Sequence, residues 1–147
     1  MIAVIQRCSQ GKVTVSDKVV GEISHGLVIL LGVQKNDTEN DAEFLVNKIC
    51  GLRIFNDEND KMNLSIKDVN GSALVISQFT LCGDLKKGRR PSFVNAAPPE
   101  DGNRLYEYFM LEMKKGGVPI ECGEFGAMMD VELVNNGPVT FVLNSKD

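Results

Sequence analysis

The chain has 147 residues, which is enough for one domain and too few for two of ordinary size, so we expect a single domain over residues 1–147. Hydrophobic residues make up 43% of the sequence and charged residues 24%, a composition that excludes intrinsic disorder and fibrous repeats. The net charge of −4 argues against a protein that coats nucleic acid with its whole surface, but it allows a local basic site.

Apolar and alternating runs predict strands in the first part of the chain. Val13 and Val15 alternate with polar neighbours, as in a strand with one buried face. The run GLVILLGV is apolar on both faces and predicts a central strand that is covered on two sides. Turn-type residues at 9–11 and 17–18 separate these runs, so the sequence predicts a meander of strands at residues 1–8, 12–16, 19–23 and 26–33.

Two segments carry the helical period. Thr38 and Asp41 form a capping-box pattern, and an apolar stripe at i, i+3, i+4 and i+7 follows before Gly51: Ala42, Leu45, Val46 and Ile49. A second helix is expected over residues 100–115, stopped by Gly116-Gly117, with one apolar face made of Leu105, Tyr108, Phe109 and Met113.

The rest of the chain predicts further strands and loops. A short extended segment at 53–55 is followed by a polar loop at 56–61, and a second buried strand is expected at 73–79. Loop signals run from Cys82 to Pro99, and the last strands are expected at 118–122, 129–135 and 139–143.

The cysteines and the single histidine do not form a metal-binding pattern. Cys8, Cys50, Cys82 and Cys122 are widely spaced, and only His25 could join them, so neither a metal nor another cofactor is expected. His25 fits an exposed turn better than a catalytic triad. With no secretory signal and no membrane span in the sequence, we expect a cytoplasmic chain with free thiols.

Two short motifs could carry chemistry. The sequence SQFTL (Ser77, Gln78, Phe79, Thr80, Leu81) ends a buried strand, where hydroxyls and free backbone N–H groups can face a ligand, although the same hydroxyls could bond the nearby backbone. In NGPVT, Asn-Gly favours a hairpin, but Pro138 lacks a ladder donor and makes a cis bond after Gly137 accessible. An ordinary tight turn is the alternative for this segment.

A basic run also stands out in this acidic chain. Lys86, Lys87, Arg89 and Arg90 lie within six residues of a loop that also holds Gly88 and Pro91. Such a loop suits phosphate, and the two arginines could grip it bidentately. A solvated loop with no ligand is the alternative.

In this order and spacing, SQFTL and NGPVT resemble the two signature motifs of the D-aminoacyl-tRNA deacylase family. The flanking sequence agrees along essentially the whole chain: Gln6-Arg7, LRIF, KMN, GRRPSF, Leu105-Tyr106 and FGAMM all fit the family pattern. Cys82 stands where members of the family often have an aromatic residue.

The resemblance implies a fold, a reaction and an assembly. The fold would be a compact single α/β domain of mixed, barrel-like β-sheets with two main helices. The reaction would be hydrolysis of the ester that joins a D-amino acid, or glycine, to the terminal ribose of tRNA, with L-aminoacyl-tRNA left intact. The assembly would be a homodimer in which Gly137 and Pro138 of one subunit reach into the site of the other and reject L side chains sterically.

The resemblance also assigns roles to single residues. Ser77 and Gln78 would shape the pocket, and Thr140 and Arg7 would belong to the substrate-binding and chiral-rejection element. The backbone N–H groups of Phe79 and Thr80 would stabilise the oxyanion. The basic loop would contact phosphates at the acceptor end of tRNA.

The same motif leaves the nucleophile open. Thr80 is the obvious side chain, but no titratable base is linked to it in the motif, so we favour assistance by the 2′-hydroxyl of the tRNA. The rival interpretations are a non-catalytic tRNA-binding module, an esterase for small D-amino acid esters, and a structural dimer without a ligand.

Overall fold

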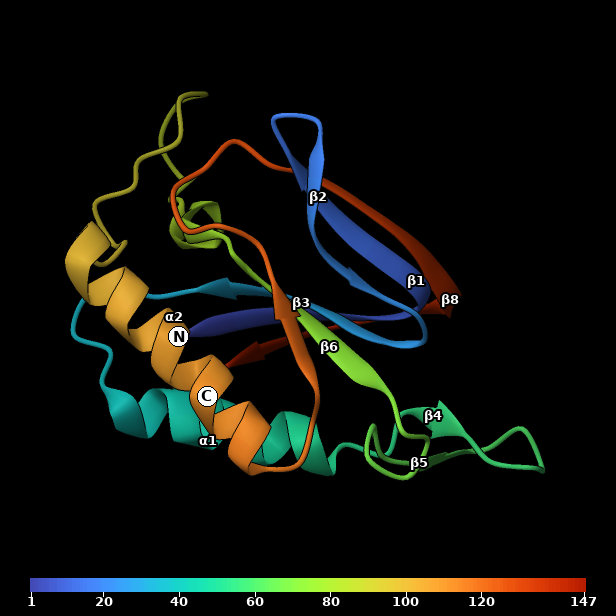
Figure 1. Cartoon of the computed structure of the whole chain (residues 1–147). Helices are drawn as coiled ribbons and strands as arrows, with labels where there is room; N and C mark the ends of the chain where they lie inside the picture. The colour runs from blue at the N-terminus through green and yellow to red at the C-terminus, as the bar shows by residue number, and fades with distance from the viewer.

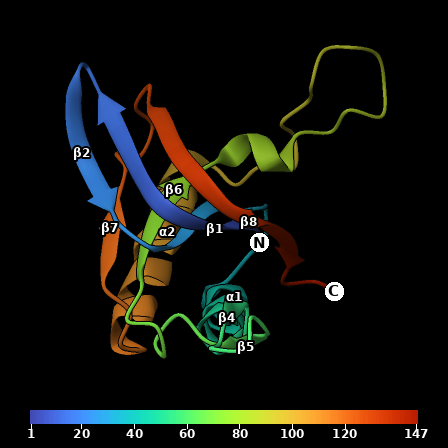
Figure 2. The same ribbon diagram turned by 90° about the vertical axis from the view of Figure 1, so that its right-hand side faces the viewer.

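The computed structural model describes residues 1–147 and contains a curved six-stranded mixed sheet with two helices packed on one face (Figures 1 and 2). This arrangement confirms the expected α/β class and its two helices. Neither helix has the length and apolar character needed to cross a membrane. In chain order the elements are β1 (Ile2–Val15), β2 (Lys18–Ile23), β3 (Gly26–Gly32), α1 (Glu39–Gly51), β4 (Phe55–Asn56), β5 (Met62–Leu64), β6 (Ser72–Ser77), the 3₁₀ turn η1 (Phe79–Cys82), α2 (Pro99–Lys115), β7 (Ile120–Cys122) and β8 (Asp130–Asn144).

The large sheet curls until its two ends almost meet. Its strands follow the order β2-β1-β3-β6-β7, and β8 pairs antiparallel with β1. β2 approaches β7 at Gly21, where a Cβ atom would lie 2.5 Å from the carbonyl oxygen of Cys122. Only glycine permits this backbone approach, which gives the sheet its barrel-like form.

Both faces of the central strands are buried, as the apolar run of β3 predicts. Alternate residues Leu27, Ile29 and Leu31 pack under α1 and α2 in the larger core. Val28 lies in a second core on the opposite face, with Val13, Ile76 and other residues inside the curl of the sheet. A sheet covered on both faces needs this continuous apolar pattern.

Three of the predicted boundaries are wrong, and the sheet explains each difference. Residues 9–11 are part of β1 and form no turn, because Gln10 and Gly11 pair with β8. Residues 129–135 and 139–143 form the single strand β8, because both halves pair with β1. The strand predicted at 73–79 ends at Ser77, and η1 follows it. In the first two cases tertiary hydrogen bonds outweigh local propensity, and in the third the strand ends where its ladder with β3 ends, at Leu31 and Ser77.

Helix α1 starts as predicted and also anchors the end of the chain. Asp41 accepts a hydrogen bond from the Thr38 N–H at 2.8 Å, completing the capping box. Its other oxygen accepts from the Ser145 hydroxyl at 2.7 Å and pairs with Lys146 at 2.9 Å. Burial alone would raise the pKa of Asp41, but the contacts with Thr38, Lys146 and Ser145 outweigh it and lower this pKa to about 2.

Candidate active site

The SQFTL motif lies at the carboxyl end of β6, where the strand gives way to η1. The Gln78 N–H donates to the Leu31 carbonyl at 2.8 Å, which ties the motif to β3. The first hydrogen bond of η1 runs from the Leu81 N–H to the Gln78 carbonyl at 3.1 Å. The N–H groups of Phe79 and Thr80 lie ahead of this bond, as the first donors of any helical turn do. The backbone therefore offers two donors beside the Thr80 hydroxyl, at an exposed edge of the sheet.

The Thr80 hydroxyl has no base beside it. The Gln78 side-chain amide donates to Thr80 Oγ1, and no histidine or carboxylate bonds this oxygen. A threonine hydroxyl is a weak nucleophile without such a base. The local geometry therefore favours a role for this turn in positioning and electrostatic stabilisation.

The NGPVT motif forms a wide bulge in β8. Thr140 pairs with Gln6 and Asn135 pairs with Cys8, so residues 136–139 stand opposite Arg7 alone. Gly137 has φ of +138°, and the Gly137–Pro138 peptide bond is cis. The ordinary tight turn considered from the sequence is therefore not formed, because β8 continues along β1 on both sides of the bulge.

Side chains on both sides of the bulge hold its shape. Asn135 Oδ1 accepts from the Val139 N–H at 2.7 Å, and its amide nitrogen donates to Thr140 Oγ1 at 2.9 Å. Gln6 donates to the same Thr140 oxygen at 3.4 Å. Sequence reasoning selected Thr140 but missed Asn135, although asparagine before a turn dipeptide is a known signal of such local hydrogen bonds.

Arg7 connects the bulge to β4. Its side chain is 7% exposed, and its Nε donates to the Asn136 carbonyl at 2.9 Å. Its Nη1 donates to the Ile54 carbonyl at 2.8 Å and to Asn56 Oδ1 at 3.1 Å. Asn56 was not predicted, because only the tertiary fold brings it to Arg7. A Cβ atom at Gly137 would lie 3.1 Å from Arg7 Nη2, so the guanidinium also limits what this position can hold.

A cavity of about 240 Å³ lies beside Arg7, and the other residues that line it include Cys8 and His25. Burial raises the pKa of the Cys8 thiol to about 11, which makes it a poor nucleophile. His25 is exposed, as expected, and its ring Nε2 lies 2.7 Å from the Val69 carbonyl.

The two motifs do not meet within one chain. On β3, Leu31 is the partner of Ser77 and Leu27 is the partner of Arg7. These positions are four residues apart, about 13 Å along the strand, and from β6 to β8 the sheet spans three strand spacings, about 14 Å. The two motifs are therefore well separated within one chain.

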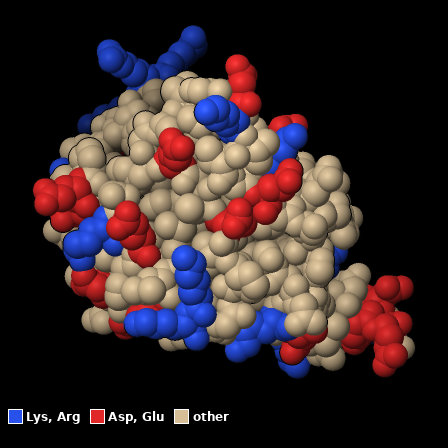
Figure 3. Space-filling view, in the orientation of Figure 1, with Lys and Arg blue, Asp and Glu red and all other residues tan.

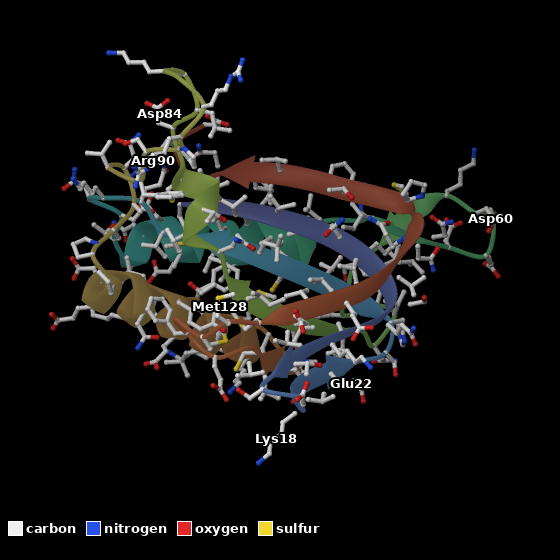
Figure 4. All side chains as sticks on the ribbon, turned by 90° about the horizontal axis from the view of Figure 1, so that it is seen from above. Lys18, Glu22, Asp60, Asp84, Arg90 and Met128 are labelled. Carbon is white, nitrogen blue, oxygen red and sulfur yellow. The ribbon has the colours of Figure 1, made fainter.

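The four basic residues lie in an exposed loop that projects beyond η1 (Figures 2 and 4). Asp84 and Ser92 close its base by two backbone hydrogen bonds of 2.7 and 3.0 Å. Lys86, Lys87, Arg89 and Arg90 take part in none of the ion pairs of the structure. Lys and Arg side chains project at this end of the molecule in Figure 3, whereas acidic and basic groups mix over the rest of that face.

The fold and the two motifs define a member of a tRNA deacylase family. The family model described as D-Tyr-tRNA(Tyr) deacylase matches residues 4–144, so the chain belongs to this family. It is 55% identical over 145 residues to a D-aminoacyl-tRNA deacylase of Thermotoga petrophila, covering 99% of this chain and 97% of that protein. A D-aminoacyl-tRNA deacylase of Koribacter versatilis is 56% identical over 146 residues, with 99% and 98% covered.

Solved structures share the fold. The c-Myc DNA unwinding element binding protein superposes with a TM-score of 0.91 at 38% identity, with 98% of both chains covered. A probable eukaryotic D-amino acid tRNA deacylase superposes with a TM-score of 0.83 at 18% identity, with 97% of this chain and 98% of that chain covered. These superpositions agree with the barrel-like α/β fold expected from the resemblance.

Proposed function

We propose that this chain hydrolyses the ester of D-aminoacyl-tRNA, and of mischarged glycyl-tRNA, releasing the free amino acid and tRNA. The activity for which its relatives are named and the match over residues 4–144 support the reaction. The observation that carries the site is the separation of SQFTL and NGPVT within the chain. SQFTL runs from the end of the inner strand β6 into an exposed turn, and NGPVT lies on the edge strand β8. We expect the enzyme to work in the cytoplasm.

The site is proposed to form between two subunits of a homodimer, with the bulge of one subunit over η1 of the other. β8 pairs with β1 alone, so its outer edge is free to meet another chain. Val134, Phe141 and Val142 on this strand are 47%, 40% and 69% exposed, which is unusual for an isolated soluble surface. The bulge of the partner would bring Gly137 and Pro138 to the substrate Cα and leave no room for an L side chain.

Ester cleavage is proposed to proceed without a protein nucleophile. The N–H groups of Phe79 and Thr80 would stabilise the oxyanion that develops on the ester carbonyl, while Ser77 and Gln78 shape the pocket. The 2′-hydroxyl of the terminal ribose would help to activate the attacking water. The absence of a base at Thr80 supports a mechanism in which the protein stabilises the oxyanion and the substrate helps to activate the water.

A deacylation assay with matched D- and L-aminoacyl-tRNA, run with enzyme below the substrate concentration, tests the proposal. We expect repeated turnover of the D substrate and an intact L substrate. Binding without turnover would indicate a tRNA-binding module, and hydrolysis of free D-amino acid esters without tRNA would indicate a small-molecule esterase. Sedimentation at micromolar concentration tests the assembly, because a monomer with full activity would contradict a site shared between subunits.

A further inference from the structure

Two aromatic side chains lie exposed at the base of the basic loop. Phe79 is 56% exposed and Phe93 is 38% exposed, and their ring centroids are 5.0 Å apart with an interplanar angle of 64°. Phe93 follows Ser92, which closes the loop with Asp84. The Phe93 ring lies against the backbone of Gly83, where a Cβ atom would come within 3.1 Å of its Cε1 atom. Phe79 therefore adjoins Thr80 and Phe93 follows the four cations in the chain, and part of the surface of both rings is open to solvent.

We propose that Phe93, together with Phe79, is a stacking platform for the unpaired nucleotides at the 3′ end of tRNA. This inference rests on the proposed function, in which η1 holds the terminal ester. Single-stranded nucleic acids bind surfaces where exposed aromatic rings lie beside cations, because every base has a π-face and every linkage carries a charge. The unpaired 3′ end has bases that are free to stack, which a paired stem lacks.

The charge of the loop identifies the occupant. Arg90 lies three residues before Phe93, at most about 11 Å of chain, so cations and rings can act on neighbouring nucleotides. None of the four cations has an acidic partner in the chain, which favours a polyanion over an apolar protein surface. The rings would add affinity that does not depend on salt, and the cations would add affinity that does.

Binding of uncharged tRNA, followed by fluorescence anisotropy over a range of salt concentrations, tests the platform independently of hydrolysis. Phe93→Leu keeps an apolar side chain but removes the π-face, and it should weaken binding roughly 5- to 100-fold with the salt slope unchanged. Phe93→Trp should restore the affinity. Phe44→Leu, at a side chain 45% exposed on α1, is the matched control and should bind like the wild type.

A tRNA trimmed of its unpaired 3′ nucleotides supplies the second arm. Wild type and Phe93→Leu should bind this trimmed tRNA equally. Equal affinity of the two proteins for intact tRNA, a changed salt slope, or failure of Phe93→Trp to restore binding would overturn the proposal. Dissociation of a wild-type dimer by Phe93→Leu would also overturn it, because the ring would then belong to the subunit interface. A wild type that binds tRNA through Phe93 but hydrolyses no ester would refute the proposed function alone.

Discussion

Replacing Arg7 with methionine should destabilise the protein and abolish the proposed activity. Arg7 is 7% exposed, and its guanidinium donates to two backbone carbonyls, of Ile54 and Asn136, and to the Asn56 side chain. Methionine has a similar length but no donor, so neither carbonyl keeps its hydrogen bond from residue 7. A buried polar group left unpaired costs about 1–3 kcal/mol in the free energy of unfolding, and this cost applies to the Ile54 carbonyl. Asn136 is exposed, so its carbonyl can bond water instead.

Urea unfolding and deacylation rates measure the two effects of this substitution. Lys12→Met, on the same strand, is the matched control, since its amine pairs with Glu132 at 3.6 Å and is 40% exposed. Removal of such a surface pair should change stability by less than about 1 kcal/mol. Arg7→Lys should fall between the two, because one ammonium cannot reproduce the fork that spans β4 and the bulge. Wild-type stability and activity in Arg7→Met would refute the view that Arg7 holds the bulge.

Four further outcomes are expected. Thr80→Ala should keep substantial activity, whereas a tRNA ending in 2′-deoxyadenosine should be a poor substrate of the wild type. The mechanism would be reversed if Thr80→Ala bound the substrate normally but were inactive, while the wild type hydrolysed the 2′-deoxy substrate at the full rate. Changing Arg89 and Arg90 to alanine should flatten the salt dependence of tRNA binding by about 0.7 in log–log slope for each single-strand phosphate that the loop no longer neutralises. An unchanged slope would mean that the two arginines belong to a solvated loop that binds no phosphate. Gly137→Ala should impair discrimination or activity, because φ of +138° disfavours a side chain and the new Cβ would lie 2.6 Å from Val139 Cγ2; a fully active and selective variant would contradict this. The pKa of Asp41 in the folded chain is about 2, below its unfolded value of about 4, so Asp41→Asn should lower the free energy of unfolding by about 2 kcal/mol at neutral pH. Urea unfolding should show this difference vanish as the pH falls from 4 to 2. A difference independent of pH would exclude the ionised carboxylate as its source.

The sequence by itself determined the elements whose signals are local. The start of α1 was predicted because Thr38 and Asp41 satisfy the first helical N–H groups from within the same turn. The burial of β3 was predicted because an uninterrupted apolar run has no face to offer to water. Glycine, proline and hydroxyl residues mark the two motifs as special backbone within a few positions, but their resemblance to the deacylase signatures was needed to choose them over an ordinary strand end and turn.

Only the tertiary structure decided how distant segments meet. Residues 9–11 have turn-type composition, yet pairing with β8 keeps them in β1, because ladder hydrogen bonds exceed a weak local preference. The bulge exists because the two halves of β8 both find partners on β1 and leave four residues opposite Arg7. The contact of Arg7 with Asn56 joins residues 49 positions apart. No local pattern encodes such contacts, because their energy appears only when the chain has closed around them.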